Sequence, residues 1–283
     1  MVDQINKKSV LKLGLIGDNI AASRAPDLHR IAGETVGRTV TYDRLVPKDM
    51  GIGFDAVFSY CVEHDYHGIN VTYPYKERAV SKVIVPDPLV KAMGAVNTIL
   101  FDGENPSGHN TDYSGFIAAF RNRFDDMSPG SVTLVGAGGA GRAVAFGLVA
   151  LGVNRICIID KELKKAHALE RDLRQVAPDL DLTIGDDVAR AVSAAEGIVN
   201  CTPIGMVGYE GTPIPATALG SQKWVFDAVY TPIETQFLRD AAAAEIPRLS
   251  GYELFFFQGV QAFKLFSGAD VVQEELRLQL SRG

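Results

Sequence analysis

Apolar and polar positions alternate in short blocks along most of the chain. Apolar runs of strand length at 11–17, 39–46 and 68–72 are separated by amphipathic stretches with helical spacing at 26–36 and 54–63. Strands that alternate with helices are typical of a parallel sheet whose faces are covered by helices. We therefore predict an α/β domain in the N-terminal part of the chain.

A second series of the same kind begins near Ser131. It predicts strands at 132–135, 155–160, 181–184, 197–202 and 224–230, with helices at 140–151 and 162–176. The polar segment 121–130, which contains Pro and Gly, is the best candidate for a domain boundary. Two consecutive helices, 252–267 and 269–280, follow the last strand. The pattern leaves open whether they cap the second sheet or return to the first domain.

Composition narrows the class of protein. A length of 283 residues suggests two domains, and 47% hydrophobic with 22% charged residues is ordinary for a soluble globular protein. The net charge of −6 argues against nucleic acid or an anionic membrane as a partner. The N-terminus lacks an apolar signal stretch, and no apolar run reaches the ~20 residues of a membrane span. The three cysteines form no C-x-x-C pair. We expect a cytoplasmic protein without a disulfide framework.

A glycine-rich turn at 136–141 fits G-x-G-x-x-G directly after a predicted strand and at the start of a predicted helix. The first glycine permits the tight turn, the second lets the backbone approach a pyrophosphate, and the third allows close helix–strand packing. The helix N-terminus adds free N–H groups for the phosphates. The predicted cofactor-binding residues of this turn are Gly136, Ala137, Gly138, Gly139, Ala140 and Gly141.

An acidic residue, Asp160, ends the next predicted strand. A carboxylate at this position accepts hydrogen bonds from ribose hydroxyls and repels a 2′-phosphate. Lys161, Lys164 and Lys165 could partly offset that repulsion, although they fit a solvated helix face better. The pattern predicts NAD as the preferred cofactor, with NADP as the alternative.

Three polar motifs stand out in the first half of the chain. They are G-I-N-V-T-Y-P-Y-K at 68–76, G-A-V-N-T at 94–98 and G-H-N-T-D-Y-S-G at 108–115. Any one of them could be a simple Asn or Asp turn. Three of them upstream of a dinucleotide turn favour a ligand site, because polar residues at strand ends are where α/β proteins bind ligands.

These motifs resemble the signature elements of the shikimate and quinate dehydrogenase family: N-V-T-x-P-x-K, G-A-V-N-T, N-T-D-x-x-G and G-A-G-G-A-G-R-A. The resemblance continues through N-C-T-P-I-G-M at 200–206 and D-A-V-Y-T-P at 227–232. It covers nearly the whole chain and is closest to the NAD-preferring quinate/shikimate branch.

The resemblance implies a discontinuous substrate-binding domain of residues 1–115 and 252–283 and a Rossmann-type dinucleotide-binding domain of residues 116–251. It places the active site in the cleft between them and implies no metal. It assigns catalysis to Lys76 and Asp112, substrate binding to Ser23, Asn70, Thr72, Asn97, Tyr230 and Gln258, and further cofactor contacts to Thr202, Met206 and Gly251.

A lysine–aspartate pair suits the oxidation of an alcohol by a nicotinamide cofactor. Oxidation of a secondary alcohol needs a hydride acceptor and a base for the hydroxyl proton. A lysine with an ordinary pKa of about 10.4 is a poor base at neutral pH. Burial lowers the pKa of a lysine and a neighbouring aspartate raises it, so such a pair acts as one coupled unit. The cofactor carries the hydride, and the protein supplies orientation and proton transfer.

The chain departs from the family pattern H-S-x-S-P near its start. The matching stretch is A-S-R-A-P at 22–26, so Ala25 stands where the family has a second hydroxyl. A hydrogen bond from that hydroxyl to a charged group would be worth about 1.5–3 kcal/mol. We interpret Arg24 as a solvent-facing loop charge rather than a replacement, and His109 as a bystander.

Several alternatives stay open from the sequence. The substrate is a small ring acid: quinate, shikimate or an amino-shikimate relative. A catalytically idle ligand sensor of the same fold is the alternative from another class, and the presence of Lys76, Asp112 and the glycine turn argues against it. The sequence leaves open a monomer or a homodimer, and the physiological direction of the reaction.

Overall fold

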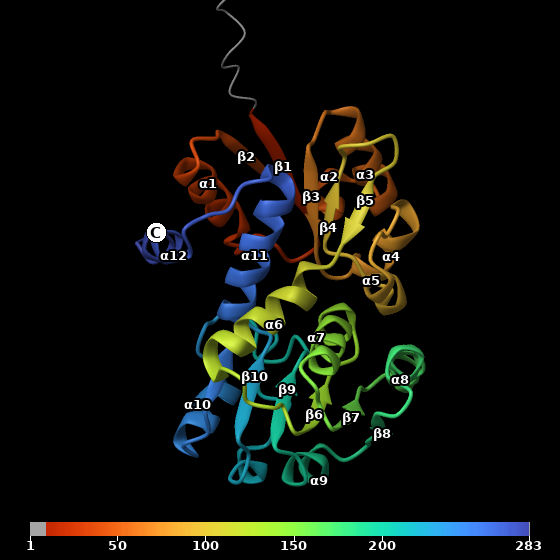
Figure 1. Ribbon diagram of the computed structural model, residues 1–283, viewed down its shortest axis with the longest axis vertical. Helices are drawn as coiled ribbons and strands as arrows, with labels where there is room; N and C mark the ends of the chain where they lie inside the picture. The colour runs from red at the N-terminus through yellow and green to blue at the C-terminus, as the bar shows by residue number, and fades with distance from the viewer. Residues whose placement is uncertain (1–9, 283) are drawn as a thin grey trace, which may run out of the picture. The chain divides into compact units, whose positions relative to one another are not determined.

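The computed structural model describes residues 10–282. Most of the N-terminal stretch that lacks a predicted signal sequence falls in residues 1–9, which lie outside this range. The chain forms two compact units (Figure 1). Of the described residues, the first unit holds 10–87, Val96–Thr111 and 259–282, and the second holds Pro88–Ala95 and Asp112–Gln258.

The first unit contains a five-stranded sheet. Its strands are β1 (Leu11–Ile16), β2 (Val40–Leu45), β3 (Gly68–Val71), β4 (Thr98–Leu100) and β5 (Ser107–His109), in the spatial order β2-β1-β3-β4-β5. The first three strands are parallel, as their alternation with helices predicts. Strands β4 and β5 pair antiparallel at one edge. These three-residue strands are too short to leave a periodic pattern in the sequence.

Helices cover both faces of this sheet. The chain moves from β1 out to β2 and then back past β1 to β3, and right-handed crossovers in opposite directions place α1 (Ala25–Thr35) and α3 (Phe54–Glu63) on opposite faces. Short helical segments follow two of the strands: α2 (Pro47–Met50), α4 (Lys76–Ala79) and the 3₁₀ turn η1 (Val80–Lys82).

The second unit contains a six-stranded sheet. Its strands are β6 (Ser131–Val135), β7 (Arg155–Ile159), β8 (Asp181–Ile184), β9 (Gly197–Asn200), β10 (Trp224–Asp227) and β11 (Arg248–Ser250), in the order β11-β10-β9-β6-β7-β8. All neighbouring strands are parallel. This doubly wound arrangement confirms the predicted α/β class with a Rossmann-type unit.

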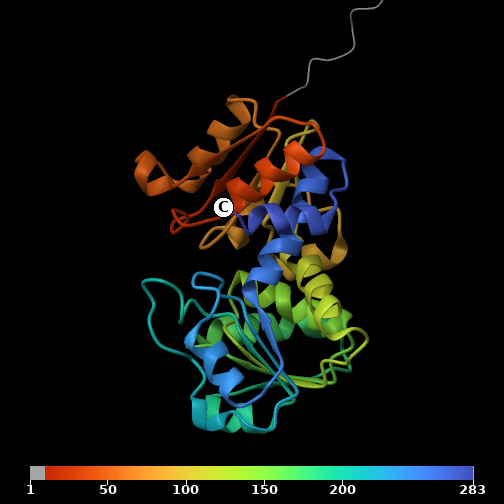
Figure 2. The same ribbon diagram turned by 90° about the vertical axis from the view of Figure 1, so that its left-hand side faces the viewer.

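Helices on both sides bury this second sheet. They are α6 (Thr111–Phe124), α7 (Gly139–Ala150), α8 (Leu163–Val176), α9 (Val188–Ser193) and α10 (Gln236–Ala243), with a 3₁₀ turn η2 (Ala216–Ala218). The short helix α5 (Pro88–Met93) packs against α7 and α8. Phe237 and Leu238 of α10 and Val192 of α9 pack with Val225 and Ile198 on one face. Aromatic residues of α6 pack on the other face, where Phe116 meets Phe226. Figure 2 shows α9 and α10 on one side of the sheet and α6 and α7 on the other.

The boundary between the two units and the course of the C-terminal helices are visible in the fold. The segment 121–130 was predicted as a domain boundary, and this is wrong for the compact units: α6 continues to Phe124, and the whole segment lies within the second unit. Its polar composition marks the end of a helix. Helix α11 (Gly251–Ser267) starts in the second unit and ends in the first, and α12 (Gln273–Leu280) lies in the first.

The returning C-terminal segment packs into the core of the first unit. A Cβ atom on Gly259 would lie 2.5 Å from the Leu28 side chain of α1, and one on Gly68 of β3 would lie 2.5 Å from the Phe266 ring. Glycine at both positions therefore permits a close approach of α11 to the sheet and to α1. Within residues 10–282, no helix is long and apolar enough to cross a membrane.

Candidate functional site

The topology of the first unit defines one edge suited to ligand binding. In open α/β sheets, ligands bind outside the carboxyl ends of the strands, where the strand order reverses. That point lies between β1 and β3. The loop after β1 carries Ser23, the loop after β3 carries Thr72, and Lys76 begins the helix that follows this second loop. The fold therefore brings three predicted site residues to the same edge.

Close contacts join the two loops at this edge. The backbone N–H of Asp18 donates to the Tyr73 carbonyl at 3.2 Å. The Tyr75 hydroxyl donates to the Asp18 carboxylate at 2.6 Å. A Cβ atom on Gly17 would lie 2.3 Å from the Thr72 methyl carbon, so only glycine fits without displacing that side chain. These contacts fix the position of Thr72.

A buried polar network lies beside these loops. Antiparallel pairing places Thr98 opposite Asn70. The Asn70 amide donates to Thr98 Oγ1 at 3.0 Å and to the Asn97 carbonyl at 3.2 Å, and its Oδ1 accepts from the Tyr42 hydroxyl at 2.9 Å. Asn97 Oδ1 accepts from the Thr111 backbone N–H at 2.7 Å. Buried amides satisfied in this way have one fixed orientation.

A neutral histidine lies next to this network. The His29 ring stacks on Tyr42 at 5.0 Å and also packs near Phe263 and Phe266. Burial lowers the pKa of His29 to about 3, despite the opposing effect of Asn70. The ring is therefore uncharged at neutral pH. Sequence reasoning missed Tyr42 and His29, because neither belongs to a recognisable motif. It also gave no role to Thr98, although Thr98 ends the G-A-V-N-T motif at 94–98.

The remaining predicted substrate-site and catalytic residues occupy defined positions within their own units. Lys76 is half-buried and begins α4, and its carbonyl accepts the Val96 N–H at 3.0 Å. Ser23 Oγ accepts the Ala25 N–H at 3.3 Å, which leaves the hydroxyl proton to donate. In the second unit, buried Asp112 lies in the first turn of α6, where the helix dipole favours a carboxylate.

Two further predicted substrate residues of the second unit lie near Phe255 of α11: Tyr230 packs on its ring, and Gln258 belongs to the same helix. The Tyr230 ring stacks on Phe255 with 5.0 Å between centroids and 12° between planes. Gln258 Nε2 donates to the Phe255 carbonyl at 2.9 Å. Its backbone packs against α6, where a Cβ atom on Gly115 would lie 2.7 Å from the Gln258 nitrogen. The Tyr230 side chain is thus held by a tertiary contact, and the Gln258 side chain by a bond within its own helix.

Arg24 differs from its prediction as a solvent-facing loop charge. The side chain is partly buried, and its guanidinium donates to the Leu280 carbonyl at 2.6 Å. The last carbonyls of a helix lack partners within the helix, and a cation there is favourable. Arg24 therefore ties the end of α12 to the start of α1. His109 lies in β5 with Nε2 3.4 Å from Ser107 Oγ, and burial lowers its pKa.

The glycine turn of the second unit has the geometry that each glycine was predicted to supply. Gly136 has φ of 100°, and a Cβ atom there would lie 2.7 Å from the Cys201 backbone. A Cβ atom on Gly141 would lie 1.9 Å from the Gly136 carbonyl oxygen. A Cβ atom on Gly138 would meet nothing within 4 Å. The turn is thus packed tightly on the protein side and open at the second glycine.

Asp160 is fixed at the mouth of this turn. Its Oδ2 accepts the Ala137 N–H at 2.7 Å, and its Oδ1 accepts the Glu162 N–H at 2.8 Å. Lys161 and Lys164 are exposed, and Lys165 pairs with Glu162 at 2.8 Å. The turn, the N-terminus of α7 and the carboxylate bring together the donors and the acceptor that fit a dinucleotide.

The switch point of the second sheet adds the remaining predicted cofactor residues. It lies between β6 and β9. Thr202 follows β9 and donates from its backbone N and its hydroxyl to Asn200 Oδ1, at 2.9 and 2.7 Å. Met206 lies in the same loop. A Cβ atom on Gly251 would lie 2.5 Å from the Ala228 carbonyl, which explains glycine there.

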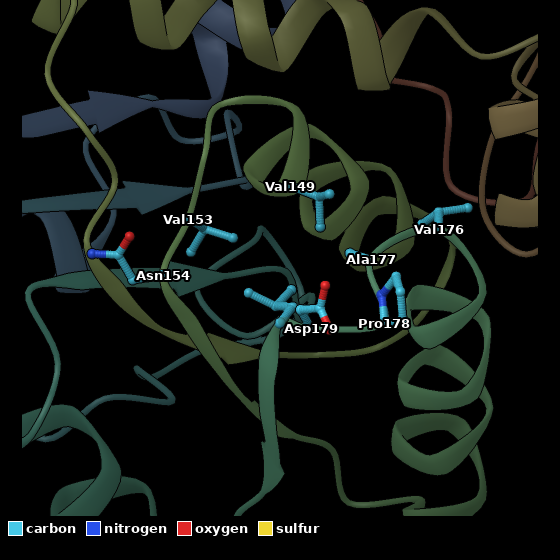
Figure 3. Close-up of a pocket in the computed structure, with 8 residues that line it drawn as sticks. Val149, Val153, Asn154, Val176, Ala177, Pro178 and Asp179 are labelled. Atoms are coloured by element: carbon cyan, nitrogen blue, oxygen red, sulfur yellow. The ribbon is translucent and has the colours of Figure 1, made fainter.

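Two hollows on the surface of the second unit lie away from the predicted substrate and cofactor residues. One hollow of about 420 Å³ lies near the ends of α7 and α8 (Figure 3), and another of about 430 Å³ is lined by residues of β6, β7, β8 and α9. Neither is lined by a predicted site residue. Across the described part of the chain, no group of three or more His, Cys, Asp or Glu side chains is placed to hold a metal ion.

The geometry defines a class of protein. One unit presents a Rossmann-type turn with a fixed acidic residue, and the other presents a polar edge with a lysine, two amides and two hydroxyls at a switch point. Together these features are those of a dinucleotide-dependent dehydrogenase that acts on a small polar substrate.

Comparison with known proteins identifies the family. Residues 15–99 match the model of the shikimate dehydrogenase substrate binding domain. The chain is 36% identical over 281 residues to a quinate/shikimate dehydrogenase (NAD(+)) of Corynebacterium efficiens, covering 96% of this chain and 98% of the relative. It is 39% identical over 271 residues to a shikimate dehydrogenase (NADP(+)) of Haloarcula marismortui, covering 94% and 97%. The chain belongs to the shikimate/quinate dehydrogenase family.

A solved structure supports this assignment over the whole chain. Quinate dehydrogenase from Corynebacterium glutamicum in complex with NAD superposes with a TM-score of 0.89 and 32% identity, covering 97% of this chain and 99% of that chain. Shikimate 5-dehydrogenase from Thermus thermophilus in complex with NADP(H) and shikimate gives a TM-score of 0.82 and 28% identity, covering 96% and 99%.

Proposed function

We propose that this protein catalyses the reversible, NAD-dependent oxidation of a ring hydroxyl of quinate or shikimate to the 3-dehydro ketone. The observation that carries the proposal is that one chain has both a polar site suited to a small substrate and a turn suited to a dinucleotide. The first unit offers Lys76 beside a fixed polar network, and the second offers a glycine turn with Asp160 at its mouth. Relatives named as NAD(+) quinate/shikimate dehydrogenases support the same activity.

In this proposal Lys76 and Asp112 form the catalytic pair. NAD held by the second unit would supply the acceptor for the hydride of the carbinol carbon. Lys76 Nζ takes the proton of the reacting hydroxyl while the C=O bond forms, and Asp112 orients the ammonium that results. Ser23 binds the carboxylate region, and Asn70, Thr72, Asn97 and Gln258 orient the ring hydroxyls, with Tyr230 close to the ring.

The proposed cofactor contacts follow the geometry of the second unit. Residues 136–141 would border the pyrophosphate, with the N–H groups of residues 138–141 as its donors, because those of Gly136 and Ala137 already donate to Ile159 and Asp160. Asp160 would accept hydrogen bonds from the adenosine ribose. Thr202, Met206 and Gly251 would border the nicotinamide half. Asp160 favours NAD over NADP because a fixed carboxylate repels a 2′-phosphate.

We further propose which parts of the chain bind the substrate and which bind the dinucleotide. Residues 1–115 with 252–283 bind the substrate, and residues 116–251 bind the dinucleotide. The partner is a small-molecule ring acid, with neither nucleic acid nor a membrane involved. A cytoplasmic location and a monomeric or homodimeric state complete the proposal.

A direct assay tests the activity. The purified protein is mixed with NAD or NADP and a panel of quinate, shikimate and amino-shikimate, and reduction is followed at the nicotinamide absorbance band. Turnover of quinate or shikimate with NAD is the expected result. Turnover of amino-shikimate alone would support the related ring-acid dehydrogenase. Ligand binding without any turnover would support the sensor.

Replacing Asp160 with serine or asparagine should narrow the preference for NAD. Both substitutions remove the charge that repels a 2′-phosphate. Loss of a hydrogen bond to a charged group, worth about 1.5–3 kcal/mol, should lower kcat/KM for NAD about tenfold or more. kcat/KM measured with both cofactors checks this, with Lys164→Ala as the surface control. A higher kcat/KM with NADP in the unmodified protein would contradict the assigned role of Asp160.

Replacing Ala25 should change the choice of substrate. Ala25 is buried at the start of α1, beside Ser23. A serine there adds a donor for the carboxylate and should raise kcat/KM for shikimate about tenfold, and threonine should do the same for quinate. Initial rates with both acids measure this. Loss of activity on the best substrate in both variants would mean that Ala25 makes room for a bulkier ring acid.

A further inference from the structure

One carboxylate of the second unit is fully buried at the end of a central strand. Asp227 ends β10 and is 0% exposed. It lies next to Asn200, the last residue of β9, in the register of the two strands. The preceding residue, Phe226, faces α6 through Phe116, so Asp227 faces the opposite side, toward α10. A buried charge at a strand end needs partners.

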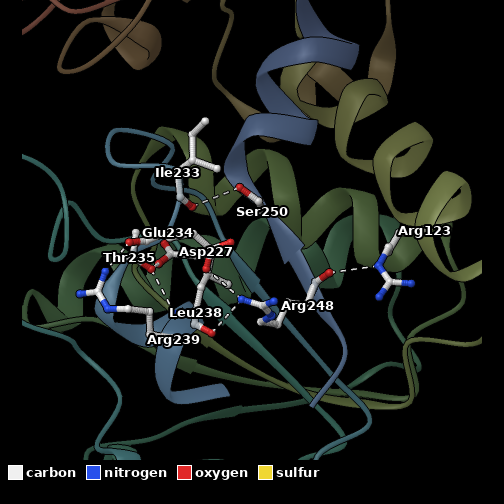
Figure 4. Close-up of polar contacts among 9 residues, drawn as sticks. All are labelled: Arg123, Asp227, Ile233, Glu234, Thr235, Leu238, Arg239, Arg248 and Ser250. Atoms are coloured by element: carbon white, nitrogen blue, oxygen red, sulfur yellow. Dashed lines mark hydrogen bonds and ion pairs between the residues drawn. The ribbon is translucent and has the colours of Figure 1, made fainter. Parts of the chain in front are cut away.

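Three hydrogen-bond donors converge on Asp227. Its Oδ1 accepts Asn200 Nδ2 at 2.9 Å and the Val229 N–H at 3.0 Å. Its Oδ2 accepts the Thr235 hydroxyl at 2.6 Å, and Figure 4 shows these two residues. Thr235 Oγ1 itself accepts the Leu238 N–H at 3.2 Å, so its own proton is directed to Asp227. All three partners are donors, and an ionised carboxylate satisfies them where a protonated carboxyl group does not.

The network continues into the loops that carry predicted site residues. Asn200 Oδ1 accepts from Thr202, and Asn200 Nδ2 also donates to the Ile204 carbonyl at 3.2 Å. The Val207 N–H donates to the Thr231 carbonyl at 3.0 Å, which joins the loop after β9 to the loop after β10. Asp227 therefore connects the loop with Thr202 and Met206 to the loop with Tyr230.

We propose that Asp227 is a positioning residue that, as a carboxylate, holds the loops carrying Thr202 and Tyr230 in the arrangement needed for cofactor binding. It acts through Asn200, Val229 and Thr235. The inference rests on the proposed function, since it assumes that the loops after β9 and β10 border the cofactor. Asn200 and Asp227 each end an apolar strand, the signal that also marks Asp160, although sequence reasoning gave neither a role.

Protonation of Asp227 gives the proposal a pH signature. Burial raises the pKa of Asp227 to about 6, while the hydrogen bonds from Thr235, Val229 and Asn200 limit the rise. As the pH falls through this value, the carboxyl group gains a proton and one donor loses its acceptor. The loops should then loosen and NAD affinity should fall.

The contribution of Asp227 to global stability should increase as the pH falls, whereas NAD affinity should decrease. A carboxyl group whose pKa is higher in the folded protein binds its proton more tightly there than in the unfolded chain, so its contribution to stability rises as the pH falls through about 6 toward 4. When the pH falls, a positioning carboxylate should therefore weaken cofactor binding while its contribution to the free energy of unfolding increases. A merely structural carboxylate would not weaken cofactor binding.

Charged side chains on the surrounding elements have other partners. Arg248 of β11 pairs with Glu234 at 2.9 Å, and Arg239 of α10 donates to the Glu234 carbonyl at 2.6 Å. Asp240 of α10 accepts from Gln236 at 2.6 Å, and Glu210 in the loop after β9 is exposed. The groups that set the titration of Asp227 are therefore burial and its three neutral donors.

The test uses Asp227→Asn in the full chain. Asparagine keeps the shape but points an N–H₂ group at existing donors. NAD affinity, measured by calorimetry at about pH 7.5, should weaken about tenfold or more. The wild-type affinity should fall between about pH 7.5 and 5, whereas the affinity of the variant should stay flat. Thr133→Val is the matched control: it removes another buried hydroxyl of this sheet, which bonds to the Ala191 carbonyl at 2.9 Å.

A second pair of variants keeps the test informative if Asp227→Asn does not fold. Thr235→Val should weaken NAD binding, and Thr235→Ser, which keeps the donor, should restore it. Thr235 also caps α10, so Asp187→Ala, which removes the side-chain cap of α9, controls for the loss of a cap and should leave NAD affinity unchanged.

Amide exchange separates this inference from the proposed function. In the cofactor-free protein, the amides of Thr202 and Val229 should exchange about tenfold faster in the Asp227 variant. A wild type that binds no NAD would refute the proposed function, and exchange would still report on the loops. A wild type that binds NAD, with unchanged affinity, pH dependence and exchange in Asp227→Asn, would overturn the positioning role alone.

Discussion

Replacing Lys76 with alanine is expected to lower kcat about 10²–10⁴-fold, the usual effect of removing a general acid or base. Lys76 begins α4 directly after the loop that follows β3, and the carbonyl of the same residue is anchored by the Val96 N–H. The backbone should therefore keep its position when the side chain is removed. KM for the ring acid should change less than kcat, because the other polar side chains still bind the substrate.

A matched surface lysine provides the control for this result. Lys82 follows Lys76 on the same helical segment and pairs with Asp55 at 3.0 Å on the surface. Such exposed pairs are worth about 0–1 kcal/mol, so Lys82→Ala should leave kcat nearly unchanged. Turnover of Lys76→Ala within a few-fold of wild type would remove Lys76 from the proton-transfer step.

The second large effect is expected at the glycine turn. Alanine at position 141 would place a Cβ atom 1.9 Å from the Gly136 carbonyl oxygen. Backbone atoms cannot rotate away as a side chain can, so the turn must move. Overpacking of this kind costs about 1–3 kcal/mol, and the displaced turn should also lose about 100-fold or more in NAD affinity. Thermal unfolding and calorimetric titration measure the two effects.

Gly138→Ala separates ligand approach from folding. A Cβ atom at position 138 meets nothing within 4 Å in the protein, so stability should stay within about 0.5 kcal/mol of wild type. NAD affinity should still fall about tenfold, because the methyl group occupies space that the pyrophosphate needs. Gly220→Ala, also in open space within the second unit, is the control. Full NAD affinity in Gly138→Ala would place the pyrophosphate elsewhere.

Much of this protein could be predicted from the order of its residues, because the features concerned depend on local backbone demands. The alternating apolar runs predict β1 to β3 and β6 to β10 with nearly correct bounds, since burial on both faces requires such runs. The three glycines at 136, 138 and 141 predict a dinucleotide turn because the backbone leaves no room for a Cβ atom at 136 and 141, and glycine at 138 keeps open the space that a pyrophosphate needs. Asp160 follows from its place at a strand end.

Other features depend on contacts between residues that are distant in the sequence, and only the folded chain shows them. The three-residue strands β4 and β5 form because β3 offers an edge to pair with, although their own sequences carry no strand signal. The Arg24 guanidinium donates to the carbonyl of Leu280, which lies near the other end of the chain, and no local sequence pattern predicts such a contact. Asp227 becomes a buried acceptor of three donors only because parallel pairing places Asn200 beside it and α10 brings Thr235 above it. The chemical meaning of such a side chain depends on its dielectric surroundings and its partners, and tertiary packing decides both.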